Sequence, residues 1–110
     1  MITDKTKWND SDYYNSNFED IMYDKLSAHE TLTNGDLTQL VNTEKSIVDQ
    51  AVVVRDMHSE IRVVVHLRDR YYAVEYWDYN DGSNWYTGQP YEVKEHIITV
   101  TEWLPVDQEL

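Results

Sequence analysis

The residues best able to hold a metal ion in this chain are its histidines, because it contains no cysteine. They are His29, His58, His66 and His96. Metal ligands on one helix or loop are usually only a few residues apart, and no two of these are so close. If their strands paired, His66 and His96 would become neighbours, but nothing else in the sequence joins them. We interpret all four as surface or half-buried side chains, and we expect no metal site and no cofactor.

Carboxylates are the second group that could do chemistry. Glu75, Asp78, Glu92 and Glu95 are the ones that could form a catalytic pair. Two at the right distance would suit a glycoside hydrolase, but with 21 acids in the chain some pair falls at any chosen spacing. A calcium loop with Gly82 at position 6 would need oxygen ligands at 77 and 79, where Trp and Tyr stand, so we predict a plain turn there. No nucleophile elbow, P-loop or dinucleotide fingerprint is present. We predict a protein that is not an enzyme.

Aromatic residues gather beside these acids in the stretch WDYNDGSNWYTGQPYEV, residues 77–93, which contains no Lys or Arg. The alternation of the strand before it predicts Tyr72 and Tyr76 in the core and Tyr71 and Trp77 on the opposite face. Trp85 and Tyr86 are expected in an exposed loop. Rings beside carboxylates suit an arginine-rich partner, through cation–π contacts and bidentate ion pairs.

The net charge is −12, which repels nucleic acid and anionic lipid. We therefore expect no direct binding to nucleic acid or membranes, whereas a basic protein partner is allowed. The excess is uneven: residues 1–50 carry −6, residues 51–70 carry +1 and residues 71–110 carry −7. The absence of cysteine fits a reducing cytoplasm. The start, MITDKTKWND, predicts no signal peptide, and the apolar runs are far shorter than the ~20 residues of a membrane span.

The elements that must position these side chains begin with a polar stretch, residues 1–15, which we predict to be an irregular arm pinned by its aromatics. Ser16 and Glu19 match a capping box, and an apolar stripe from Phe18 to Leu26 predicts a helix behind it. Asn34-Gly35 indicates a turn. Beyond it, Leu37, Leu40 and Val41 indicate a short second helix or a turn, started by Asp36.

From Ile47 the apolar period becomes two, which indicates strands. Residues 47–55 form the first, and in the second the odd positions from Ile61 to Leu67 should face the core. Residues 71–78 form a third strand and 79–90 a loop. The last strand region, 91–103, shifts phase between Val93 and Ile98, which predicts a β-bulge.

Short connections favour an α+β fold, in which the N-terminal helix packs on a three- to four-stranded antiparallel meander sheet. We expect one domain, 1–110. Its expected parts are the arm 1–15, a helical part 16–45, the sheet 47–103 and an acidic tail 104–110.

The segment QPYEVKEHIITVTEWLPV, residues 89–106, resembles the C-terminal strand region of small proteins from phages and prophages of Gram-positive bacteria. More broadly, the short, acidic, cysteine-free chain is similar to phage-encoded anti-CRISPR proteins and other DNA mimics. That resemblance implies an inhibitor in the bacterial host cytoplasm, which binds a basic nucleic-acid enzyme such as an RNA-guided nuclease and excludes its DNA or RNA.

The leading hypothesis is thus a phage-encoded inhibitor whose fixed carboxylates imitate phosphates. The candidate partner-binding residues are Asp20, Asp24, Asp78, Tyr79, Asp81, Trp85, Tyr86, Glu92 and Glu95. Reversal of Asp78 and Asp81 to Lys is expected to weaken binding. The alternatives are an adaptor or phage assembly component whose charge only serves solubility, and a small carbohydrate-binding or hydrolytic domain. Either a monomer or a homodimer fits the sequence.

Overall fold

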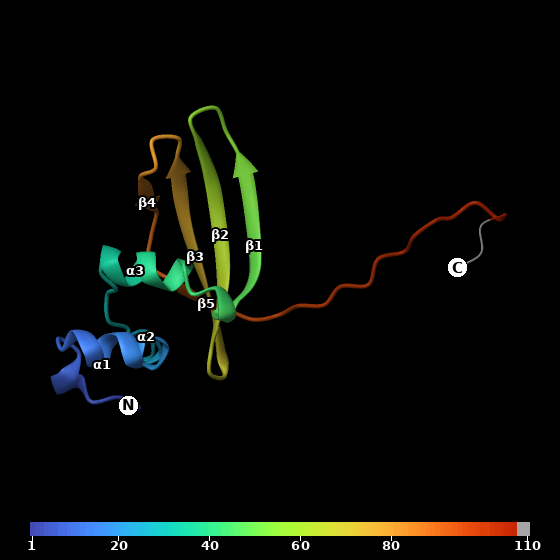
Figure 1. The fold of residues 1–110 in the computed structure, drawn as a ribbon. Helices are drawn as coiled ribbons and strands as arrows, with labels where there is room; N and C mark the ends of the chain where they lie inside the picture. Colours follow the sequence, from blue (N-terminus) through green and yellow to red (C-terminus); the bar gives the residue numbers. More distant parts are fainter. Residues whose placement is uncertain (108–110) are drawn as a thin grey trace.

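The computed structural model describes residues 1–107 and shows an α+β fold, as the sequence predicts. Helices come first in the chain and lie on one face of an antiparallel sheet (Figure 1). The helices are α1 (Ser11–Ser16), α2 (Phe18–Ser27) and α3 (Asn34–Val41), with 3-10 turns η1 (Lys5–Lys7) and η2 (Glu44–Ser46). The strands are β1 (Ile47–Val54), β2 (His58–Leu67), β3 (Arg70–Tyr79), β4 (Asn84–Tyr86) and β5 (Tyr91–Val93).

The sheet runs in the order β1-β2-β3-β4, and β5 also pairs with β3. Trp77 of β3 lies opposite Trp85 of β4, and Tyr71 of β3 lies opposite Val93 of β5. The two short strands therefore follow one another along the same edge of β3. Residues 87–90 interrupt them, and Pro90 lacks the N–H that a continuous ladder would need. The predicted antiparallel meander is confirmed, and part of the expected loop is strand β4.

The core lies between the helices and the sheet face that they cover. Ile61, Val63, Val65 and Leu67 of β2 are buried there, which confirms the predicted phase of this strand. The other members of the core cluster are Phe18, Ile21, Met22, Leu32, Leu37, Leu40, Val41, Tyr72 and Val74. Tyr76 is half-buried against it. The core positions predicted for the two tyrosines are thus confirmed, Tyr72 fully and Tyr76 at its margin.

The predicted capping box at Ser16 and Glu19 is wrong. Asn17 is the N-cap of α2, and Ser16 is the last residue of α1. The carboxylate of Glu19 instead accepts a hydrogen bond from the hydroxyl of Ser46 in η2. The Glu19 carboxylate, which the sequence pattern assigns to a local helix cap, thus makes a tertiary contact instead.

Helix α3 carries the capping box of this fold. Thr33 accepts a hydrogen bond from the backbone N–H of Asp36, 3.1 Å away, and Asp36 accepts one from the N–H of Thr33, also at 3.1 Å. Each side chain satisfies a donor that the helix leaves free. Of the two alternatives, helix or turn, the structure has the helix. It begins at Asn34 rather than at Asp36, so the turn predicted at Asn34-Gly35 is wrong: these residues start α3.

The N-terminal segment is folded, not an irregular arm. Asp10 caps α1 by accepting from the N–H of Tyr13 at 3.0 Å. Trp8 donates from its indole Nε1 to the hydroxyl of Thr3 at 2.9 Å. Trp8, Tyr13 and Tyr14 all pack against the core, so the aromatics hold the segment to the body as predicted.

The C-terminal residues leave the sheet after β5. Residues 94–107 form no strand and extend away from the body (Figure 1). The predicted continuation of the sheet to residue 103, with its bulge, is therefore wrong. The reason lies in β3, which begins at Arg70: Val93 lies opposite Tyr71, so residues beyond 94 have no more of β3 to pair with.

Candidate binding face

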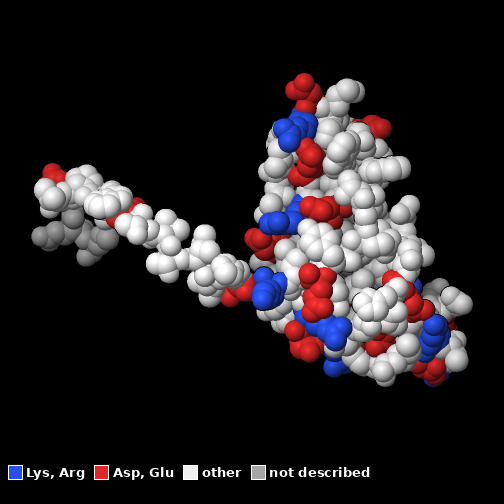
Figure 2. Space-filling view, turned by 180° about the vertical axis from the view of Figure 1, so that it is seen from behind, with Lys and Arg blue, Asp and Glu red and all other residues white. Residues whose placement is uncertain are grey.

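The helices cover only one face of the sheet, and we call the opposite side the outer face. Strand register assigns residues to it, since Arg62 lies opposite Glu75, His66 opposite Tyr71, and Trp77 opposite Trp85. These side chains alternate with core residues along the same strands. Acidic and basic side chains follow one side of this face, next to a broad area without charged side chains (Figure 2).

Two aromatic stacks hold rings of the outer face in place. His58 stacks on Trp77 with ring centroids 4.2 Å apart and planes 17° apart. At the other end of the strands, His66 stacks on Tyr71 with centroids 4.3 Å apart and planes 8° apart. Trp85 is 64% exposed. Stacking fixes Trp77, and Trp85 is the more accessible tryptophan of the outer face.

One end of the sheet, which we call the sheet tip, unites two hairpin turns. The tip consists of residues 55–60 and 77–85. The turns are held together by Asn80, whose N–H donates to the carbonyl of Met57 at 3.2 Å and whose Nδ2 donates to the carbonyl of Asp56 at 3.3 Å. The tip contains four acids, Asp56, Glu60, Asp78 and Asp81, against one cation, Arg55.

The arginine at the tip is already engaged, since its Nε donates to the carboxylate of Glu60. That hydrogen bond is the main reason that the pKa of Glu60 is lowered. Asp56, Asp78 and Asp81 thus remain as a local excess of negative charge beside exposed rings. Coulomb attraction between this group and a cationic surface would be weakened by salt.

Asp81 has a structural role within the tip. Its carboxylate accepts hydrogen bonds from the hydroxyl of Ser83 at 2.6 Å and from the N–H of Ser83 at 2.9 Å. These bonds, the hydroxyl's first, lower the pKa of Asp81, so the group is ionised near neutral pH. Gly82 follows with φ +90 and allows the tight turn. The predicted turn at 80–82 is present.

The structure brings four of the nine predicted partner-binding residues together at the sheet tip. These are Asp78, Tyr79, Asp81 and Trp85. Tyr79 lies beside His58, with ring centroids 5.6 Å apart.

Two more of the nine, both acids, lie on α2 and serve the fold. Asp24 is 3% exposed, and its carboxylate accepts from the N–H groups of Ile2 and Thr3 at 2.8 and 2.7 Å. Asp20 accepts from Nε of Arg68 at 3.0 Å. These acids are therefore neutralised or enclosed, and the idea that α2 presents them to a partner does not fit the structure.

Tyr86 also differs from its expected place in an exposed loop. It is half-buried in β4 on the core side, where its ring lies 5.5 Å from that of Tyr76 and its hydroxyl is hydrogen-bonded to Thr38 at 2.9 Å. The register explains this, because Tyr86 lies opposite Tyr76 and next to the outward Trp85.

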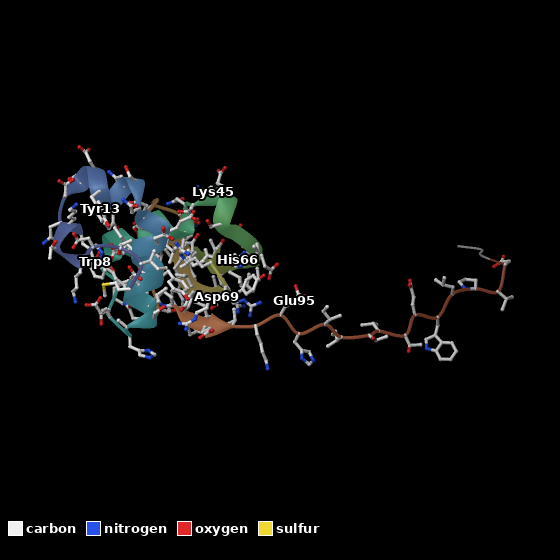
Figure 3. The ribbon with its side chains drawn as sticks, turned by 90° about the horizontal axis from the view of Figure 1, so that it is seen from below. Trp8, Tyr13, Lys45, His66, Asp69 and Glu95 are labelled. Atoms are coloured by element: carbon white, nitrogen blue, oxygen red, sulfur yellow. The ribbon has the colours of Figure 1, made fainter. Side chains whose placement is uncertain are left out.

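The last two candidates, Glu92 and Glu95, lie at the end of the sheet remote from the tip. Glu92 is opposite Tyr72 at the sheet edge. Glu95 stands where the C-terminal residues leave the body, far from the N-terminal Trp8 and Tyr13 (Figure 3). One continuous row of the six acids among the nine residues is therefore not present within residues 1–107.

Sequence reasoning missed His58 and Asp56 as members of the site. A signal for them exists, because in an antiparallel meander the first and third turns lie at the same end of the sheet. The turn after β1 and the turn after β3 had to meet, whatever the details of the loops. Applying this rule would have joined 55–58 to 79–83.

Within the described part of the chain, no group of three or more His, Asp or Glu side chains is arranged to hold a metal ion. Among the same residues, no helix has the length and apolar character needed to cross a membrane. Comparison of the chain with protein-family models, curated proteins and solved structures found no match.

Proposed function

We propose that this protein is a non-catalytic binding protein whose sheet tip docks onto a basic, arginine-bearing surface of a partner protein. The observation that carries the proposal is the union, at one end of a hydrogen-bonded sheet, of unpaired acids with Trp77, Tyr79 and the exposed Trp85. Aromatic residues are enriched among interface hot spots.

The chemistry of the tip favours arginine over lysine. A guanidinium group can lie flat on the indole ring of Trp85, and another can donate two hydrogen bonds to the carboxylate of Asp78, which the register places on the other face of the tip. An ammonium group has no such plane. The stack between His58 and Trp77 holds the latter ring before the partner arrives, so little side-chain freedom is lost on binding.

For the identity of the partner, we infer a basic nucleic-acid enzyme of a bacterial host, such as an RNA-guided nuclease, whose binding site the tip would occupy in place of DNA or RNA. The net charge of −12 and the excess of acids at the tip support this. The mimicry would act through the tip, since the acids of α2 are used within the fold.

An adaptor or assembly role is the second candidate. The observation that favours it is the exposed apolar side chains beyond β5, among them Trp103 at 91% exposure. Such side chains suit partners that bind through apolar contact, and salt would weaken that binding little.

The test compares two peptides of equal length and charge, one rich in arginine and one rich in lysine, by isothermal titration with the full chain. We expect the arginine peptide to bind more tightly, and we expect Trp85→Ala to remove most of that preference. The double reversal Asp56→Lys with Asp78→Lys should weaken binding about tenfold or more, which corresponds to ~1.4 kcal/mol. Asp81 is left unchanged because it holds its turn.

A matched control separates the site from the net charge. Asp12→Lys with Glu44→Lys makes the same change of charge at exposed positions of the helical part. The proposal fails if this control weakens binding as much as the tip reversal, or if both peptides bind equally well. Displacement of the chain from a candidate nuclease by duplex DNA then tests the mimicry itself.

A further inference from the structure

The C-terminal tail, residues 94–107, has the composition of a strand and the exposure of a linker. Ile97 is 83% exposed, Val100 75% and Trp103 91%. Linkers that stay solvated are poor in β-branched and aromatic residues, whereas these residues are typical of strands. Burial of these apolar side chains would be strongly favourable, which indicates that another protein surface covers them.

Strand β1 offers the complementary surface in the same chain. In the described sheet it stands at the end of the order and pairs with β2 alone, so one row of its N–H and C=O groups is free. Natural edge strands are usually protected by Lys, Pro or a bulge. Strand β1 has a register shift between Ile47 and Asp49, but from Asp49 to Val54 it is regular and has neither Lys nor Pro. Val52, Val53 and Val54 are 51%, 48% and 77% exposed.

The two segments match in length and in pattern. Strand β1 spans eight residues, and so does the stretch 97–104 of the tail. As a strand, the tail would place Ile98 and Val100 on one face and Ile97 and Trp103 on the other. Beside β1, one of these sets would extend the face that carries Val52, and the other would extend the outer face.

We infer that the tail of one copy pairs with the β1 edge of a second copy, and that two copies exchange tails reciprocally. The course of the tail favours a second copy over the same chain. Residues 94–96 share a surface depression with Val48 and Val64 on the outer face, and the tail then continues outward, away from its own β1 (Figure 1). A two-fold arrangement satisfies both edges and both tails and closes the assembly.

This pairing is strand addition, in which backbone hydrogen bonds give affinity and alternate side chains give register. It does not cover Trp77 or Trp85, because these lie on β3 and β4 at the other side of the sheet. A dimer would therefore present two sheet tips. Each copy carries −12, so the copies repel and added salt should strengthen their association. Added salt should instead weaken the binding of the chain to the basic partner proposed above.

The experiment measures the mass of the full-length chain by sedimentation equilibrium from about 1 to about 500 µM. We expect a dimer that dissociates on dilution. Ile98→Lys with Val100→Lys in the tail, and Val52→Lys with Val54→Lys in β1, should each weaken the dimer at least tenfold. The control Asn9→Lys with Thr31→Lys adds the same charge at exposed positions and should leave the dimer in place.

Mixing the two weakened variants gives the sharpest result. The tail variant keeps an intact β1 and the β1 variant keeps an intact tail, so a mixed dimer has one unaltered junction. We expect the mixture to associate more tightly than either variant alone. A chain that stays monomeric over the whole range overturns the inference. So does a dimer that the tail variant leaves unchanged.

Hydrogen exchange tests the alternative that the tail pairs with β1 of its own chain. Slow exchange of residues 97–104 in a monomer would mean that the tail folds back on its own β1, and the second copy would be rejected. The proposed function is tested separately, because the arginine-peptide assay uses variants of the tip that do not touch β1 or the tail.

Discussion

The carboxylate of Asp24 should hold the N-terminal segment to the body. Its removal should destabilise the protein more than the removal of an exposed acid from a helix does. Three donors converge on it: the N–H of Ile2 at 2.8 Å, the N–H of Thr3 at 2.7 Å and the hydroxyl of Thr3. Because the sequence of this helix is rich in acids, its acidic side chains would be expected to face solvent. Asp24 is nevertheless only 3% exposed.

The magnitude follows from these contacts. A hydrogen bond to a charged group contributes about 1.5–3 kcal/mol. The sum over three such bonds would exceed the free energy that holds the segment to the body. Once the segment of residues 1–3 peels away, water satisfies its donors, and the cost stops at the free energy of that local opening. We therefore expect Asp24→Ala to lower the free energy of unfolding by about 2–3 kcal/mol.

The pH dependence has a definite sign. Burial raises the pKa of Asp24, but the hydrogen bonds from Thr3 and Ile2 outweigh it, so the pKa in the folded state is lowered. Its stabilisation is complete above the unfolded pKa, near 4, and is lost as the pH falls through the folded value. The difference in stability between wild type and Asp24→Asn should thus be constant near pH 7 and shrink below about pH 4.

Urea unfolding followed by tryptophan fluorescence measures these differences, and Trp8 reports the local opening because its indole donates a hydrogen bond to Thr3 of that segment. Asp12→Asn, an exposed acid of α1, is the control and should change stability by less than about 0.5 kcal/mol. If Asp24→Ala unfolds at the same urea concentration as the control, or if the difference grows with acidity, the reasoning is refuted.

Two further substitutions test the core and the sheet tip. Leu40→Ala removes a side chain with 0% exposure and should cost about 2–5 kcal/mol in urea unfolding, whereas Met57→Ala, at 74% exposure, should cost little. Gly82→Ala places a side chain at φ +90 and should cost about 1–2 kcal/mol by thermal unfolding. Gly88→Ala meets no atom within 4 Å and has no positive φ, so equal losses at both glycines would contradict the backbone argument.

The strands could be predicted because their side-chain period is a local property. Ile61 to Leu67 alternate with polar residues, and one face of β2 is buried as that alternation requires. The same logic placed Tyr72 and Tyr76 correctly. The end of the sheet could not be predicted this way. Residues 97–103 have strand composition, but a strand also needs a partner to pair with, and β3 begins at Arg70, level with the end of β5.

The helical part shows a different limit. The six residues of α1 are too few for an apolar period, and the helix depends on Asp10 at its cap and on rings packed against the core. The burial of Asp24 arises because the chain start returns to α2 from 21 and 22 residues away in sequence. Neither contact leaves a mark in the local pattern, and this is why an acid of the fold was taken for an acid of the binding site.

The candidate site was half predictable for a geometric reason. In Figure 1 the helices lie across one part of the sheet, and the hairpins of β1–β2 and β3–β4 extend beyond them. Ile61, 9% exposed, and the half-buried Tyr76 opposite it mark the limit of the cover. Beyond this limit both faces are wet, so Val54 and Asp78 are exposed although their register points to the core side.

An uncovered tip of this kind needs charge whatever its function, because bare strand ends associate. The acids at the tip are thus expected both for solubility and for recognition, and their presence alone does not separate the two. Acids that serve only solubility would attract arginine and lysine side chains equally. Recognition asks for planar cations, which can stack on Trp85 and can donate two hydrogen bonds to Asp78 on the other face of the tip. A preference for arginine over lysine, lost with Trp85→Ala, is therefore the property that solubility cannot produce.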